Sequence, residues 1–159
     1  MVLCLLLIAS MFIAPVSASA ASGNKVVQIL KVTADGARLR EGPSSAYEVI
    51  TSLKDGEKVF YLDKQVDAFC RVRTSKGKIG YMYKGFLKSY GAAYYDQIYY
   101  SKNKSVKVYK KASTSTKKVA VLSKNQHVIV YEVKGRWAYI MTLGGTGGYV
   151  KKSNLAKAK

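Results

Sequence analysis

Cys70 and His127 are the side chains of this sequence best suited to act as a nucleophile and a general base. A thiol becomes a useful nucleophile when a base lies within hydrogen-bond reach. The two residues lie in different halves of the chain, and Cys70 sits in an alternating apolar segment where a small buried side chain is expected. We expect His127 at a surface or edge position without a partner. The pair therefore does not predict nucleophilic catalysis.

The sequence also has few residues that could support other kinds of catalysis. The chain has 9 Asp and Glu residues, and only Asp96 and Glu132 lie beyond residue 90. General acid–base catalysis needs a positioned pair, and no close pair recurs in both halves. Two cysteines and one histidine are too few for a metal cluster or a disulfide framework. We expect no enzymatic activity, no metal site and no cofactor.

Aromatic and cationic side chains offer binding chemistry instead. Alternate side chains of a strand point to opposite faces, so inward Cys70 and Val72 leave their neighbours outward. The residues predicted to bind a ligand in this way are Phe69, Arg71, Tyr81, Tyr83, Trp137, Tyr139 and Tyr149. Aromatic faces pack on sugar rings and peptide backbone, while cations pair with carboxylate or phosphate. Alternatively, these aromatic residues cover domain ends or the contact between domains.

Positive charge is concentrated in the second half. The 159 residues carry a net charge of +18, with 13 Lys/Arg against 7 Asp/Glu in residues 21–90 and 14 against 2 in residues 91–159. Seven lysines fall between residues 102 and 118, and we expect four of them to bind a polyanion: Lys110, Lys111, Lys117 and Lys118. The alternative is a solvated face that keeps the protein soluble.

An internal repeat organises the chain. A shift of 69 residues places Leu53 on Leu122, and a shift of 68 then places Phe69 on Trp137. Short strands are expected over residues 25–32, 37–40, 57–62, 69–74 and 79–83. Strands this short hide their apolar face by curling into a small barrel. We therefore predict an all-β fold of two tandem barrels, residues 21–90 and 91–159, with a seam near 89–93.

Four tyrosines crowd around that seam: Tyr94, Tyr95, Tyr99 and Tyr100. They could lie between the two barrels and fix their orientation, or extend the ligand surface across both barrels. We favour the structural role.

Two motifs resemble a known family. The run ARLREGPSS at residues 37–45 resembles the opening signature of bacterial Src-homology-3-like domains. The Gly-Tyr pairs at residues 80–81 and 148–149 are similar to the ending of that signature. The second copy lacks the Gly-Pro of the opening motif. The resemblance implies two SH3-like barrels that act as non-catalytic modules for cell-wall targeting, often attached to peptidoglycan hydrolases.

The first residues resemble an export signal. Residues 2–16 are almost all apolar and precede small residues suited to cleavage, so we expect a signal peptide over residues 1–20. The apolar run is too short to span a bilayer. We therefore expect no membrane span after its removal, and a protein that is secreted or wall-associated in a Gram-positive bacterium.

Among polyanions, the cell wall fits these features best. Export makes nucleic acid a poor partner, so we expect no specific nucleic acid, and no amphipathic helix is evident for membrane binding. Peptidoglycan suits the aromatic residues, and teichoic acid phosphates suit the lysines. We expect a monomer that binds the wall. The alternative is an interaction module that docks a wall hydrolase or a host surface molecule.

Overall fold

The computed structural model describes residues 25–158, so the expected signal segment lies outside the described residues. The first sheet consists of β1 (Val26–Val32), β2 (Ala37–Arg40), β3 (Val49–Leu53), β4 (Lys58–Val66), β5 (Phe69–Thr74), β6 (Ile79–Tyr83) and β7 (Leu87–Tyr94). The second consists of β8 (Ile98–Ser101), β9 (Val106–Tyr109), β10 (Lys118–Leu122), β11 (His127–Lys134), β12 (Trp137–Thr142), β13 (Gly147–Lys151) and β14 (Leu155–Lys157). Three 3-10 turns complete the fold: η1 (Lys84–Phe86), η2 (Tyr95–Gln97) and η3 (Lys152–Asn154).

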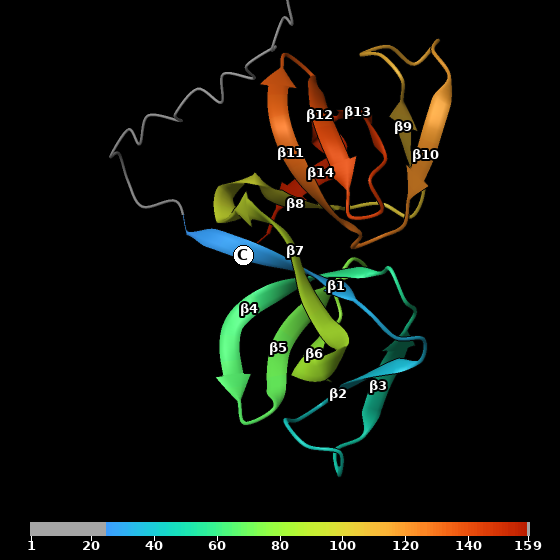
Figure 1. The fold of residues 1–159 in the computed structure, drawn as a ribbon. Coiled ribbons are helices and arrows are strands. Elements are labelled where there is room, and N and C mark those ends of the chain that lie inside the picture. Colours follow the sequence, from blue (N-terminus) through green and yellow to red (C-terminus); the bar gives the residue numbers. More distant parts are fainter. Residues whose placement is uncertain (1–24, 159) are drawn as a thin grey trace, which may run out of the picture.

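The two sheets have the same topology. Their strand orders are β3-β2-β6-β5-β4-β1-β7 and β10-β9-β13-β12-β11-β8-β14, so each strand of the second is its counterpart in the first advanced by seven. Figure 1 shows the two units, each curled on itself, one above the other. The predicted all-β fold of two tandem barrels is confirmed. None of the helical turns within residues 25–158 has the length and apolarity needed to cross a bilayer.

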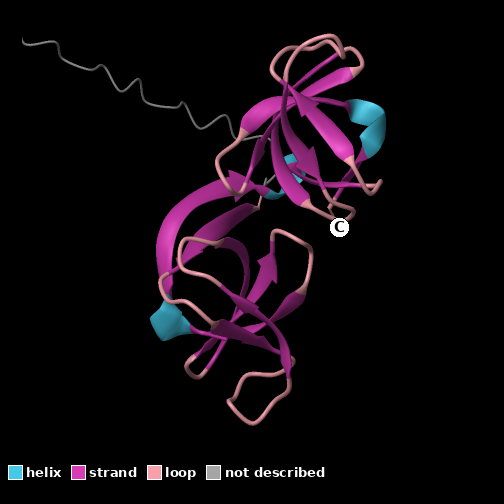
Figure 2. Cartoon of the chain, turned by 90° about the vertical axis from the view of Figure 1, so that its right-hand side faces the viewer, coloured by secondary structure: helices cyan, strands magenta, loops and turns pink. Residues whose placement is uncertain are grey.

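The predicted seam lies inside a strand. β7 pairs with β1 from Val26–Tyr94 to Val32–Leu87, and in Figure 2 the curved strand after η1 runs from one unit toward the other. Sequence pattern missed this strand because Ala93 is the single buried residue on it. A strand that buries so little side-chain surface shows no alternation of apolar and polar residues. The pattern also missed β3, whose side chains are mostly exposed or half-buried.

Each barrel has its own core, built from equivalent positions. Leu39, Val72 and Met82 are fully buried in the first barrel, and Val108, Ile140 and Val150 occupy the matching positions in the second. The inward and outward phases predicted for β5, β6, β12 and β13 are therefore confirmed. Cys70 is also buried in the first core, as expected, and burial raises the pKa of its thiol.

A third apolar cluster joins the two barrels, and we call it the junction cluster. Its members come from both units: Val27, Ile29, Phe60, Ala93, Ile98, Ile129, Leu143 and Ala158. Across the same junction the backbone N–H of His127 donates a hydrogen bond of 2.7 Å to the Ser75 carbonyl. The two barrels are therefore packed together and are not simply tethered by a linker.

His127 lies in this junction, so the expectation of a surface or edge position without a partner is wrong. Its side chain is only 7% exposed, and its ring Nδ1 donates to the Asn125 carbonyl at 2.9 Å. The rings of Tyr100 and Phe60 lie with centroids 5.7 and 6.3 Å from the His127 ring. Burial lowers the pKa of His127, and the positive charge of Arg73 lowers it further. The residue sits at the start of a strand, but the first barrel covers it.

Two of the four seam tyrosines lie at the junction between the barrels. Tyr95 packs against the junction cluster, Tyr99 packs against the second core and Tyr100 contacts His127. Tyr94 is largely exposed. Tyr95 and Tyr100 therefore have the structural role between the barrels that the sequence favoured, whereas Tyr99 packs inside the second barrel.

Candidate functional site

The outer face of β5 and β6 carries an aromatic cluster. Phe69 pairs with Tyr83 across the two strands, and their ring centroids are 5.9 Å apart in an edge-to-face arrangement. The Phe86 ring lies 5.5 Å from that of Tyr83 in the same manner. Tyr83 and Phe86 remain 44% and 40% exposed, so their faces are accessible to a ligand. The strand pattern predicted Phe69 and Tyr83 but missed Phe86, which lies in η1.

These rings form one wall of a cavity of about 520 Å³, which we call the first hollow. Its lining residues are Gly36, Arg38, Arg40, Ser45, Phe69, Tyr83 and Phe86. Arg40 donates a hydrogen bond of 2.7 Å from Nη1 to the Tyr47 carbonyl and so ties β2 to the loop that follows it. Aromatic faces beside guanidinium groups suit a sugar ring or a peptide that ends in a carboxylate.

Gly42, the glycine of the Gly-Pro motif, shapes the loop beside the first hollow. The Tyr47 ring lies directly over Gly42, and a Cβ atom at that position would stand 2.5 Å from Tyr47 ring carbons. Only a glycine therefore allows Tyr47 to fold back onto the loop, which fixes the Tyr47 carbonyl that Arg40 binds.

The second unit has a cavity at the same place in its fold, which we call the second hollow. It has a volume of about 290 Å³ and is lined by Asn103, Ser105, Val106, Lys107, Tyr109, Thr114, Lys151 and Asn154. Six of these are the repeat equivalents of first-hollow residues, in the pairs Gly36 and Ser105, Arg38 and Lys107, Arg40 and Tyr109, Ser45 and Thr114, Tyr83 and Lys151, Phe86 and Asn154. The duplication has therefore kept the position of the cavity and changed its lining.

The predicted aromatic residues of the second copy cover the sheet beside this cavity. The Trp137 ring packs edge-to-face on Tyr109 with centroids 5.9 Å apart, and the Tyr139 and Tyr149 rings are 5.1 Å apart. All three predicted residues are half-buried, and none of them lines the second hollow. The sequence missed Tyr109, which links the ring cluster to the cavity wall.

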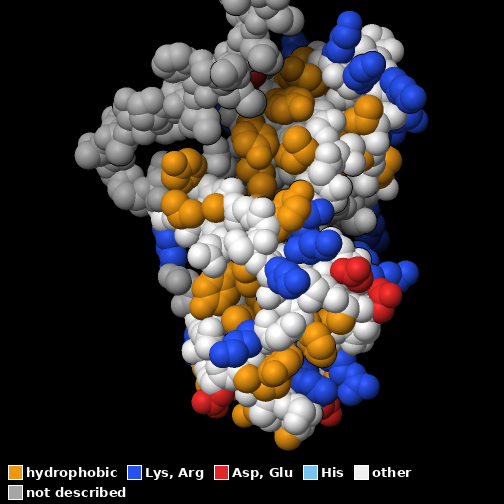
Figure 3. Space-filling model, viewed as in Figure 1, with side chains coloured by type: hydrophobic (Ala, Val, Ile, Leu, Met, Phe, Trp, Pro, Cys, Tyr) orange, Lys and Arg blue, Asp and Glu red, His pale blue; other side chains and the backbone are white. Residues whose placement is uncertain are grey.

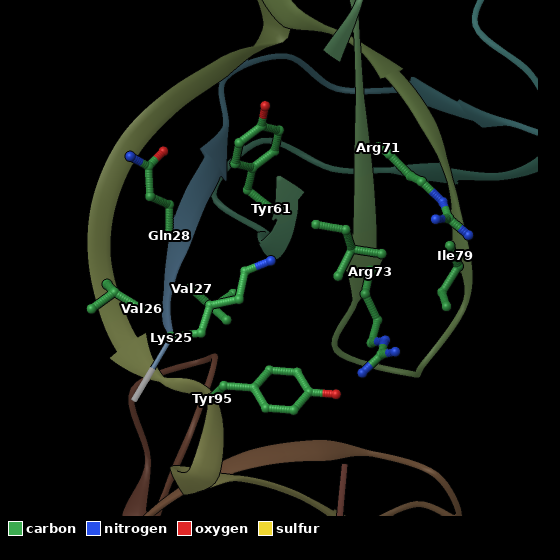
Figure 4. Close-up of a pocket in the computed structure, with 10 residues that line it drawn as sticks. Lys25, Val26, Val27, Gln28, Tyr61, Arg71, Arg73, Ile79 and Tyr95 are labelled. Atoms are coloured by element: carbon green, nitrogen blue, oxygen red, sulfur yellow. The ribbon is translucent and has the colours of Figure 1, made fainter. Parts of the chain in front are cut away.

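The structure separates Arg71 from the aromatic cluster. With Arg73, it lines another cavity of about 410 Å³ near η2, which also contacts Lys25 and Tyr95. Figure 4 shows Lys25 and Tyr95 on one side of this cavity and the two arginines of β5 on the other. Tyr81 lies between the two regions, because it pairs with both Arg71 and Arg40. Residues of the first copy that were predicted to form one surface thus line two separate cavities.

The four predicted lysines gather around the β9–β10 loop. Lys110, Lys111, Lys117 and Lys118 are all exposed, and the Lys110 N–H donates to the Lys117 carbonyl at 2.9 Å. Figure 3 shows Lys and Arg side chains over this part of the second unit, while the acidic side chains on that face lie mostly over the first. No group of three or more His, Cys, Asp or Glu side chains lies together within residues 25–158.

Comparison with known proteins finds one family that matches both units. The family described as bacterial SH3 domain matches residues 35–88 and 104–156. A solved structure of NlpC2 from Trichomonas vaginalis is 15% identical and has a TM-score of 0.34, and the match covers 86% of this chain and 50% of the NlpC2 chain. The structure of an NlpC/P60 family protein from Bacillus cereus is 12% identical and has a TM-score of 0.36, and the match covers 80% of this chain and 55% of that protein. The chain spans about half the length of these structures. No curated protein matches the sequence.

Proposed function

The chain belongs to the bacterial SH3 domain family, and from that premise we propose that it is a non-catalytic protein that binds the bacterial cell wall through both barrels. Domains of this family are commonly cell-wall binding. The observation that carries the proposal is the cavity that recurs at one position in both units, beside aromatic and cationic side chains. A duplicated cavity is the expected result when a binding site is copied with its fold.

The chemistry of the two units matches the components of a Gram-positive wall. In the first hollow, aromatic faces and two arginines suit sugar rings or a peptide with a free carboxylate. Around the β9–β10 loop, exposed lysines suit the phosphates of teichoic acid. One wall polymer assembly therefore accounts for both kinds of surface, and the expected export signal would bring the protein to it.

Rigid attachment of the two units favours binding at two points. The junction cluster and the hydrogen bond from His127 to Ser75 hold the barrels in one arrangement. When one unit is bound, the other is held close to the same polymer at high effective concentration. The avidity gained in this way needs no additional contact.

A sedimentation assay with purified Gram-positive sacculi tests the proposal. A Tyr83→Ala/Phe86→Ala variant removes the exposed wall of the first hollow, and we expect affinity to fall about tenfold, which corresponds to about 1.4 kcal/mol. Tyr131→Ala is the matched control, because Tyr131 is 56% exposed and lies outside both hollows. Removing teichoic acid or raising the salt concentration should weaken binding by the wild-type protein.

Two results would count against wall binding. The first is an absence of sedimentation with sacculi at every salt concentration tested. The second is the recovery of a single protein in stoichiometric amount by the immobilised chain, with no retention on sacculi, which would favour an interaction module that docks a wall hydrolase.

A further inference from the structure

The second hollow differs from the first in the side chains that form its wall. Tyr83 and Phe86 form the accessible aromatic wall of the first hollow, whereas Lys151 and Asn154 stand at the equivalent positions in the second. An ammonium group and an amide thus replace two aromatic rings. The second hollow has lost the surface that packs on a sugar or peptide and gained hydrogen-bond donors.

Two lysines from neighbouring strands line this hollow. Lys107 lies on β9 and Lys151 lies at the end of β13, and these two strands pair at Tyr109 and Tyr149. Both lysines are exposed and both line the cavity. Two positive charges in the wall of one cavity repel each other. An anion between the two ammonium groups would turn this repulsion into attraction.

The other polar residues of the second hollow can also donate hydrogen bonds. Asn103 donates from Nδ2 to Asn154 Oδ1 at 3.2 Å, which leaves the amide N–H groups of Asn154 for another acceptor. Ser105 and Thr114 add hydroxyl groups to the lining. A tetrahedral oxyanion accepts several hydrogen bonds at once, so a lining of this kind suits it.

No carboxylate lines the second hollow. Beyond residue 90 the sequence has only Asp96 and Glu132. Glu132 lies 3.3 Å from Lys134 on its own strand, and Asp96 lies in η2 between β7 and β8. The two lysines of the hollow are therefore not neutralised by an acidic side chain in the cavity wall.

We propose that the second hollow is a phosphate-binding site formed by Lys107, Lys151 and Asn154. Lysine binds phosphate as a point charge, and the amide and hydroxyl groups beside the two lysines add donors for its oxygens. The exposed lysines of the β9–β10 loop extend the positive charge beyond the cavity, as a polymer of repeated phosphates requires. This inference deepens the proposed function and rests on it only for the source of the phosphate.

An NMR titration of the chain from residue 21 onward tests the site. The probes are inorganic phosphate and glycerol 3-phosphate, with uncharged glycerol and acetate as comparisons. We expect both phosphates to shift the amide signals of Lys107, Lys151 and Asn154, and a Lys107→Ala/Lys151→Ala variant to bind glycerol 3-phosphate at least about tenfold more weakly. Lys124→Ala/Lys134→Ala removes the same charge outside the hollow and should bind almost as the wild type does.

The following outcomes decide the inference. Equal loss in the two lysine variants would overturn it, because net charge alone would then explain binding. Signals that move with neither phosphate, or equally with acetate, would also overturn it. Competition by purified teichoic acid would support the site and assign a wall polymer as its source, whereas competition by small phosphates only would support the site and assign free phosphate. Phosphate binding without sedimentation on sacculi would keep this inference and reject wall binding.

Discussion

Replacing Phe60 with alanine should destabilise both barrels together. Phe60 belongs to the first barrel, is 1% exposed and packs in the junction cluster with residues of the second. Truncating a buried phenylalanine to alanine costs about 3–5 kcal/mol from lost transfer free energy and the cavity left behind. Since whole domains are stable by about 5–15 kcal/mol, this loss is a large fraction of the total.

The single tryptophan makes the coupling measurable. Trp137 lies in the second barrel, so its fluorescence during urea unfolding reports on that barrel while the substitution is in the first. With a urea dependence of about 2 kcal/mol/M, the predicted loss lowers the unfolding midpoint by about 1.5–2.5 M. Phe86→Ala is the control, because Phe86 is 40% exposed and its truncation should shift the midpoint by less than about 0.5 M.

Far-UV circular dichroism recorded on the same samples separates the two possible results. Coincident transitions by circular dichroism and Trp137 fluorescence, both shifted by Phe60→Ala, would show one cooperative unit. A Trp137 transition that keeps its wild-type midpoint while circular dichroism reveals earlier unfolding would refute the reasoning, because the barrels would then unfold independently.

Two further predictions concern stability. The pKa of His127 is lowered in the folded chain, so the unfolded chain binds more protons in acid. The urea midpoint should therefore fall as the pH drops below about 6.5 and stay level above that pH. A His127→Gln variant whose midpoint falls equally between pH 7.5 and 5.5 would contradict this prediction. A Cβ atom at Gly80 would stand 2.5 Å from the Arg40 carbonyl oxygen and one at Gly148 2.8 Å from that of Tyr109, so alanine at either position should cost about 1–3 kcal/mol by urea unfolding. Gly91→Ala is the control, with open space around it, and an equal loss there would rule out the steric explanation.

Repetition and alternation made much of the fold predictable. The match of Phe69 with Trp137 and of Tyr81 with Tyr149 showed one structural unit used twice. The alternation around Val72 identified the buried face of β5, because a strand has two faces and one of them must be apolar. β7 was not predicted, because it pairs beside β1 with almost all of its side chains exposed and so has no apolar face to reveal it.

The local pattern therefore determined the fold class, the repeat and which side chains point outward, because these depend on neighbours in the chain. Only the tertiary structure decided which outward side chains meet. It brought Arg38 and Phe86 to one cavity, sent Arg71 to another and covered His127 with the first barrel. Such contacts depend on how each sheet curls and how two barrels pack, and these long-range arrangements leave no periodic signal in the sequence.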